Sequence, residues 1–141
     1  MEENRLIVPD ASTLIKWTAL EDDDLENALR LREDFTNKKC RILIPALCMW
    51  EINNFLGRNL DTEGAMHFFS IFKQYNFRQA MPTFEISHLA FQLMKKAEKI
   101  SFYDASYHSL AISSEGTFLT ADKKYFEKTK KFGHIKLLSN Y

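Results

Sequence analysis

Two short apolar runs that end at proline constrain the fold of this chain most strongly. Residues 6–8 (Leu-Ile-Val) run into Pro9, and residues 40–44 (Cys-Arg-Ile-Leu-Ile) run into Pro45. Because proline has no N–H to give to a sheet ladder, each run is predicted to be a short strand that stops there. Pro45 is expected in the first turn of the following helix. Asp10 is expected at the end of a buried strand, where it either caps a helix over residues 11–17 or joins a functional site.

Strand-like and helix-like segments alternate along the rest of the chain. The acidic run 21–24 is expected to form the first turn of a helix that continues to Phe35. Further helices are predicted over residues 46–57, 61–75, 83–99 and 104–116, with a lysine-bearing helix after Asp122, and further strands over 77–81, 117–119 and 135–138. This alternation predicts an α/β fold with a central, mainly parallel sheet of four to five short strands flanked by helices. No repeat or linker divides the sequence, so residues 1–141 are expected to form a single domain.

The composition excludes several classes of protein. The chain is 45% hydrophobic and 27% charged, which is the balance of a folded globular protein. Its formal net charge of zero argues against a protein that holds nucleic acid by bulk electrostatics alone. No apolar run is long enough to span a membrane, and residues 1–4 are acidic where a signal peptide is basic. A cytoplasmic protein is expected, with Cys40 and Cys48 as reduced thiols.

Four acids stand at positions where such a fold gathers functional groups. Asp10 and Asp122 each follow a predicted strand, while Glu51 and Asp104 are expected on helices that follow short loops. If the four side chains point into one crevice, their mutual repulsion destabilises the fold unless a cation offsets it. Oxygen ligands without neighbouring His or Cys select a hard cation, Mg²⁺ or Mn²⁺, as one ion or two. Such an ion activates water and offsets the charge of a phosphate, so the predicted reaction is hydrolysis of a phosphodiester.

Four segments of the chain resemble the motifs of a known family. They read VPDASTLIKW, PALCMWEINNFLGR, FYDASYHSLA and FLTADKKYF, and each contains one of the four acids. Together they resemble the acidic motifs of PIN-domain ribonucleases, and most of all those of the VapC-type toxins of type II toxin-antitoxin modules. The resemblance implies a PIN-like fold. It assigns metal binding and catalysis to Asp10, Glu51, Asp104 and Asp122.

The resemblance also implies supporting residues and partners. The polar neighbours that orient the acids would be Ser12, Asn54 and Thr120. The lysines that would steer the RNA backbone, unless they are only solvated, are Lys16, Lys123 and Lys124. Toxins of this kind are endoribonucleases that pair as homodimers and are silenced by an antitoxin peptide inserted into the active-site groove. A mild departure is Asn53, which stands where a small apolar residue is more common in the family.

Other interpretations stay open at this point. A housekeeping PIN nuclease of RNA maturation would carry the same acids, whereas the intact set argues against a PIN-fold adaptor that binds RNA or a partner without cutting. A receiver domain also gathers acids at strand ends, but the predicted strand 77–81 ends without one. The histidines are assigned no catalytic part, although one of them shares a helical face with Asp104 four residues before it. They are His67, His88, His108 and His134.

Overall fold

The computed structural model describes residues 4–141, so the first three residues of the acidic N-terminus lie outside the described part of the chain. Its centre is a five-stranded parallel sheet with the order β3-β2-β1-β4-β5. The strands are β1 (Arg5–Pro9), β2 (Cys40–Pro45), β3 (Arg78–Ala80), β4 (Thr117–Thr120) and β5 (Ile135–Leu137). The N-terminal strand is therefore central, and the carboxyl ends of all five strands meet at one edge of the sheet. The predicted α/β class and parallel sheet are confirmed.

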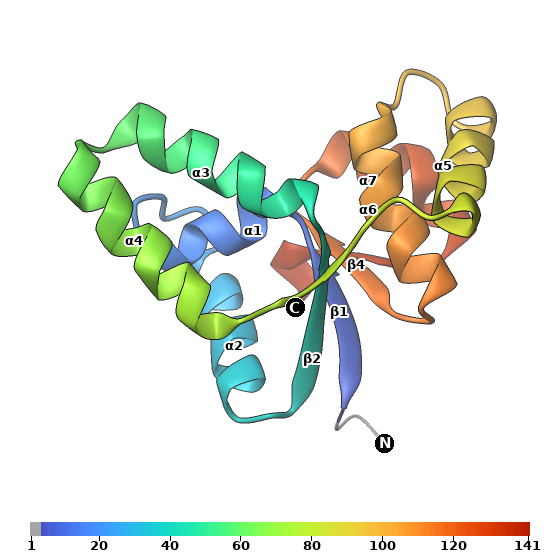
Figure 1. Ribbon diagram of the computed structural model, residues 1–141. Helices are drawn as coiled ribbons and strands as arrows, with labels where there is room; N and C mark the ends of the chain where they lie inside the picture. Colours follow the sequence, from blue (N-terminus) through green and yellow to red (C-terminus); the bar gives the residue numbers. More distant parts are fainter. Residues whose placement is uncertain (1–3) are drawn as a thin grey trace.

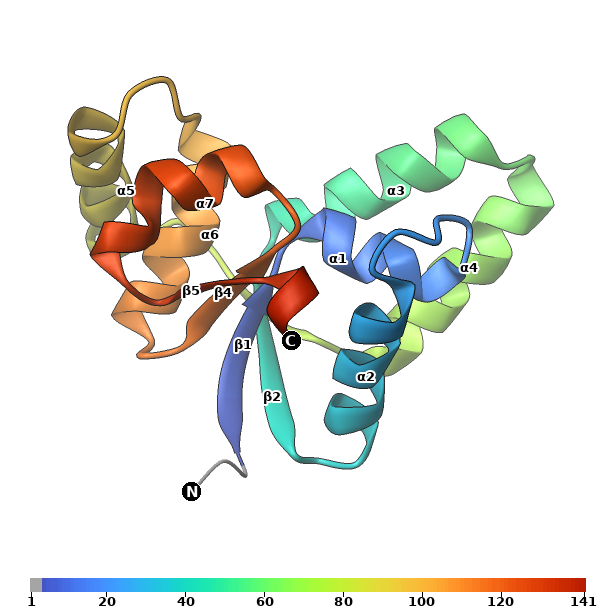
Figure 2. The same ribbon diagram turned by 180° about the vertical axis from the view of Figure 1, so that it is seen from behind.

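Helices flank the sheet on both sides (Figure 1). They are α1 (Ala11–Ile15), α2 (Leu25–Thr36), α3 (Leu47–Asn59), α4 (Thr62–Tyr75), α5 (Phe84–Lys96), α6 (Phe102–Ser113) and α7 (Lys123–Thr129), with 3₁₀ turns at Lys16–Thr18, Lys130–Phe132 and Leu138–Asn140. Helices α1 to α4 lie to one side and α5 to α7 to the other, as the view from behind also shows (Figure 2). α6 packs against β1, β2 and β4, and α2 against β2. No helix within residues 4–141 is long and apolar enough to cross a membrane.

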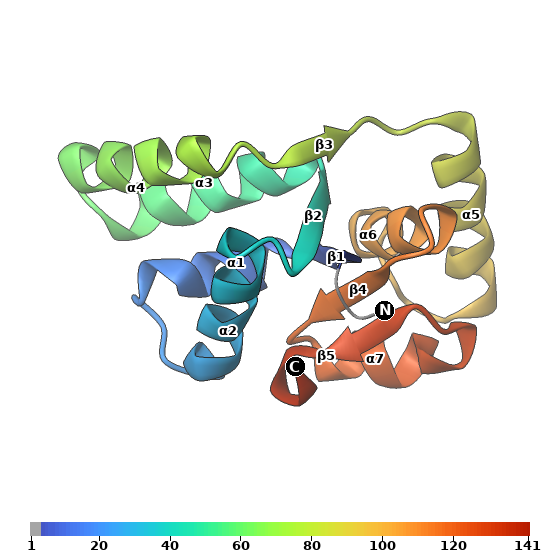
Figure 3. The same ribbon diagram turned by 90° about the horizontal axis from the view of Figure 1, so that it is seen from below.

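Apolar side chains of the central strands form the core beneath the carboxyl edge. Val8, Ile44 and Leu119 are completely buried, each on a different strand. Gly116 lets β4 approach β1 closely, because a Cβ there would lie 2.8 Å from the carbonyl oxygen of Leu6. α3 and α4 pack together as a hairpin that extends away from the sheet (Figure 3). The most buried part of the sheet is thus the central strand β1 with its neighbours β2 and β4.

Several predicted boundaries differ from the structure for local reasons. Pro45 is the last residue of β2, and not part of the first turn of α3, which begins at Leu47. The acidic run 21–24 precedes α2 instead of forming its first turn. Asp24 occupies the N-cap position with a φ of 55°, and its side chain makes no capping hydrogen bond. The run was therefore wrongly interpreted as the start of the helix.

The helix that carries Asp104 begins earlier than predicted. Ser101 is its N-cap, because the side-chain oxygen of Ser101 accepts a hydrogen bond from the backbone N–H of Asp104 at 3.0 Å. Asp104 consequently lies in the first turn of α6, where the helix dipole favours an acid. The preceding helix, α5, ends at Lys96 and is shorter than the predicted segment 83–99.

Candidate active site

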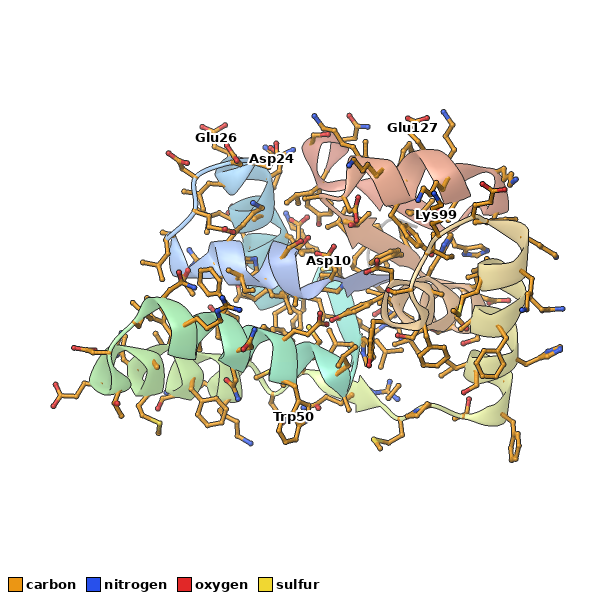
Figure 4. All side chains as sticks on the ribbon, turned by 90° about the horizontal axis from the view of Figure 1, so that it is seen from above. Asp10, Asp24, Glu26, Trp50, Lys99 and Glu127 are labelled. Atoms are coloured by element: carbon orange, nitrogen blue, oxygen red, sulfur yellow. The ribbon has the colours of Figure 1, made fainter. Side chains whose placement is uncertain are left out.

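All four predicted acids line one hollow at the carboxyl edge of the sheet. This acidic hollow encloses about 380 Å³ and is lined by Asp10, Ala11, Ser12, Glu51, Asp104, Tyr107, Ala121 and Asp122. The lining comes from the β1–α1 junction, α3, α6 and the β4–α7 junction. Figure 4 looks onto the carboxyl edge and shows Asp10 near the centre of the molecule, between the two groups of helices. The fold therefore brings together acids that are far apart in the sequence.

Asp10 caps a helix and faces the hollow at the same time. Its Oδ1 accepts hydrogen bonds from the backbone N–H of Thr13 at 2.9 Å and from the Ser12 hydroxyl at 2.8 Å. Its Oδ2 accepts from the Thr120 hydroxyl at 2.6 Å. The two interpretations of Asp10 that the sequence left open, cap and site residue, are compatible in this geometry. Three donors hold the carboxylate in one orientation.

Asp122 also caps a helix, at the end of the neighbouring strand β4. Its Oδ1 accepts from the backbone N–H of Tyr125 at 3.0 Å and so caps α7. Its own backbone N–H donates to the Thr120 hydroxyl oxygen at 3.0 Å. Thr120 is 1% exposed and uses its single hydroxyl to join Asp10 to Asp122. One buried side chain thus links the acids that follow the neighbouring strands β1 and β4.

Glu51 reaches the hollow from α3 and is held by an aromatic residue of α6. The hydroxyl of Tyr107 donates to Glu51 Oε1 at 2.6 Å. Burial raises the pKa of Glu51, and the hydrogen bond from Tyr107 opposes that rise. The negative charges of Asp10 and Asp104 raise the pKa of Glu51 further. Glu51 is therefore electrostatically coupled to two of the other acids.

The pKa of Asp104 responds to the charges of Asp122 and Asp10. Burial raises the pKa of Asp104, the charge of Asp122 adds to the rise, and the interaction of the Ser101 side chain with the Asp104 carboxylate opposes it. The charge of Asp10 is a further, smaller contribution to the raised pKa of Asp104. Since Glu51 and Asp104 both have raised pKa values, the ionised acids destabilise one another across the hollow. Positive charge placed among them would relieve that repulsion.

Comparison with protein-family models gives the family. The model of the PIN domain matches residues 7–131, which include all four acids. The chain belongs to the PIN-domain family. No curated protein matched this PIN domain in a sequence search.

Solved structures share the fold of this PIN domain. The FitAcB structure from Neisseria gonorrhoeae is similar with a TM-score of 0.72 and 13% identity, covering 93% of this chain and 95% of that one. VapBC2 from Rickettsia felis, bound to a DNA fragment from its promoter, has a TM-score of 0.63 and 19% identity, covering 94% and 96%. VapC20 from Mycobacterium tuberculosis, described as a sarcin-ricin loop cleaving toxin, has a TM-score of 0.64 and 16% identity, covering 86% and 93%. At these identities the similarity establishes the fold.

The donors in the hollow of this PIN domain fit a hard divalent cation. Its charged side chains are all carboxylates, and oxygen donors of this kind suit Mg²⁺ or Mn²⁺. Within residues 4–141, no three or more His, Cys, Asp or Glu side chains form a group able to hold a metal ion as they stand. The acids instead line the walls of the hollow with space between them. This spacing suits Mg²⁺, because that ion keeps several waters and takes few direct carboxylate ligands.

The other predicted site residues occupy three kinds of position. Asn54 is exposed on α3 and is absent from the lining of the hollow. Lys123 and Lys124 are exposed at the start of α7, directly after Asp122. Lys16 is only 6% exposed, and its Nζ lies 3.9 Å from Glu21 Oε1. RNA contact by these lysines stays a prediction, and the buried position of Lys16 makes it the least accessible of the three.

Of two further α6 side chains near Asp104, His108 was noted in the sequence and Tyr107 was not. His108, noted for sharing a face with Asp104, is completely buried, with its ring nitrogens 2.9 Å from the Tyr125 hydroxyl and 2.7 Å from the Gly133 carbonyl. It is a core residue whose polar atoms are satisfied. Tyr107 was not singled out, although its place one turn after Asp104 on the same helix was a readable signal.

Proposed function

We propose that this chain is a metal-dependent endoribonuclease that hydrolyses RNA phosphodiester bonds, and that it acts as the toxin of a type II toxin-antitoxin pair. The observation that carries the proposal is the convergence of Asp10, Glu51, Asp104 and Asp122 on one hollow at the carboxyl edge of a parallel sheet. Membership of the PIN-domain family supports the same conclusion. So does the shared fold with VapC20, which is described as a toxin that cleaves the sarcin-ricin loop.

In this proposal, the four acids hold one or two Mg²⁺ or Mn²⁺ ions. Such an ion, when bound, lowers the pKa of a coordinated water and offsets the negative charge of the phosphate. The protein contributes carboxylates that are fixed before the ion arrives. Thr120 and Ser12 orient Asp10, and the first turn of α7 orients Asp122. A fixed set of ligands costs little reorganisation when the metal and the phosphodiester bind.

The proposed substrate and partners follow from the surface around the hollow. Lys123 and Lys124 project from the turn that carries Asp122, so their positive charges would meet the RNA backbone next to the acids. Structures of similar fold include a complex from Klebsiella pneumoniae described as a toxin-antitoxin complex, which supports a cognate antitoxin as partner. In this proposal, the antitoxin blocks the hollow. A homodimer in the cytoplasm completes the proposal.

The proposal is tested by cleavage of a labelled, structured RNA with purified protein and Mg²⁺ or Mn²⁺. Chelator and the Asp104→Asn variant should each abolish cleavage, because one removes the ion and the other a charged ligand. Asp23→Asn changes an exposed acid outside the hollow and should cut like the unmodified protein. Cleavage that survives both chelator and Asp104→Asn would refute the metal-dependent nuclease. RNA binding without any cleavage would favour the adaptor instead.

A further inference from the structure

We propose that Tyr107 is a positioning residue that holds the carboxylate of Glu51 at the acidic hollow and thereby sets the affinity of this site for its metal. The inference rests on the proposed function, since it deepens the role of the same hollow. Tyr107 lies on α6 and lines the hollow together with the four acids. Its hydroxyl bridges to Glu51 on α3, 56 residues away in the sequence, with an oxygen–oxygen distance of 2.6 Å.

Glu51 needs such a restraint more than the two acids at the strand ends, Asp10 and Asp122, do. Asp10 has three hydrogen-bond donors, and Asp122 has a backbone N–H. In the part of the chain that the structure describes, the Tyr107 hydroxyl is the only donor to the Glu51 carboxylate. A glutamate also has one more rotatable bond than an aspartate, so an unrestrained Glu51 would lose more conformational entropy on binding a metal.

Electrostatics inside the metal-free hollow would otherwise move Glu51 away. The charges of Asp10 and Asp104 both disfavour the ionised form of Glu51. A free carboxylate on the exposed side of α3 would swing toward water to escape that repulsion. The short hydrogen bond to Tyr107 opposes this motion, because hydrogen bonds to an ionised acceptor are stronger than neutral ones.

The tyrosine itself is fixed by the core. Tyr107 is 2% exposed, and its ring stacks on Phe118 of β4 with centroids 5.7 Å apart and an interplanar angle of 18°. Phe118 is also 2% exposed and belongs to the strand that ends at Thr120. The hydroxyl is thus anchored to the same central strand that orients Asp10 and Asp122. The geometry connects the acid on α3 to the two acids at the strand ends through one packed aromatic pair.

The test compares Tyr107→Phe with the unmodified protein in two metal titrations. The variant keeps the ring and removes only the hydroxyl, so the packing on Phe118 is retained. One titration follows RNA cleavage against Mg²⁺, and the other follows the rise in melting temperature that Mg²⁺ or Mn²⁺ produces without RNA. We expect Tyr107→Phe to need roughly 10-fold more metal in both titrations, as is usual when a residue that orients a metal ligand is changed. Its cleavage rate should recover at saturating metal.

Tyr141→Phe is the matched control. Its hydroxyl also donates to a carboxylate, that of Asp34, but at a place outside the acidic hollow. This control should leave both titrations unchanged. A Tyr107→Phe protein with a lower melting temperature but unaltered metal midpoints would overturn the inference, because the hydroxyl would then serve stability alone. Unmodified protein that responds to metal in neither titration would overturn the proposed function and this inference with it.

Discussion

Replacing Thr120 by valine tests whether the buried hydroxyl between the two strand ends organises the site. The substitution keeps the shape of the side chain and removes one hydroxyl that makes two hydrogen bonds. Thr120 donates to Asp10 Oδ2 at 2.6 Å and accepts from the backbone N–H of Asp122 at 3.0 Å. Because Thr120 is 1% exposed, its hydroxyl makes both bonds away from bulk water.

The expected loss of stability follows from the two bonds. A hydrogen bond to a charged group contributes about 1.5–3 kcal/mol, and the N–H left without its acceptor costs about 1 kcal/mol more. The added methyl group recovers up to about 0.8 kcal/mol of apolar transfer energy. Asp10 keeps its bonds to Ser12 and Thr13, so it is not left unpaired. The net destabilisation should be about 2–3 kcal/mol, or roughly 7–10 °C in melting temperature for a chain of this size.

Urea unfolding of metal-free protein measures this loss, with Thr129→Val as the control. Thr129 is also completely buried, but its hydroxyl donates to the neutral carbonyl of Tyr125 at 2.7 Å. The control should therefore lose only about 1 kcal/mol. If Thr120→Val lowers the free energy of unfolding by no more than Thr129→Val does, the idea that a charge-assisted hydrogen bond joins the strand ends is refuted. RNA cleavage should fall in the Thr120→Val variant and stay unchanged in the Thr129→Val control.

Three further predictions concern charge and reactivity. Asp104→Asn should stabilise the metal-free protein at pH 7 by about 0.5–1 kcal/mol after solvent screening, because the raised pKa of Asp104 means that its ionised form opposes folding. Urea unfolding should show that gain shrinking as the pH falls through the raised pKa of Asp104, because the unmodified acid then takes up its proton and loses the unfavourable charge. Replacing Lys123 and Lys124 by alanine should weaken RNA binding and reduce its salt slope by about 0.7 for each phosphate that a lysine no longer neutralises, measured by binding titrations at several salt concentrations. Burial raises the pKa of Cys40 to about 11 and of Cys48 to about 12, so a thiol reagent at pH 8 should label neither until the protein unfolds.

Each of these has an outcome that contradicts it. Equal or lower stability of Asp104→Asn at pH 7 would mean that the acids in the hollow do not repel one another. An unchanged salt slope, with Lys95→Ala as an exposed control on α5, would make the two lysines only solvated residues. Rapid labelling of native protein would indicate that the strand or helix that buries a cysteine opens readily.

The parts of the fold that the sequence predicted are those fixed by local chemistry. Pro9 and Pro45 end β1 and β2 because each lacks the N–H that continues a ladder. Asp10 was predicted at the end of a buried strand for the same reason, and it is found there. The acids after strands could be located from the sequence, since strand ends and helix caps leave signals a few residues long.

The parts that could not be predicted depend on contacts between distant segments. Nothing within a few residues of Tyr107 indicates that its hydroxyl meets Glu51 across the hollow. The burial of Lys16 is likewise not indicated by the residues next to it in the sequence. Ser101 is different, because a serine three residues before Asp104 is a recognised capping pattern that would have placed the start of α6 correctly.

The central position of β1 has a consequence for the synthesis of the protein. β1 is made first, yet it pairs with β4, and the hydrogen bond from Thr120 to Asp10 spans 110 residues. A nascent chain still lacking β4 therefore carries Asp10 without its partner strand, and it lacks Asp122 altogether. Because such long-range pairing forms only after the intervening chain exists, the acidic hollow cannot assemble until residue 122 has left the ribosome. If the proposed nuclease activity needs all four acids, the growing chain gains that activity only after residue 122 has emerged.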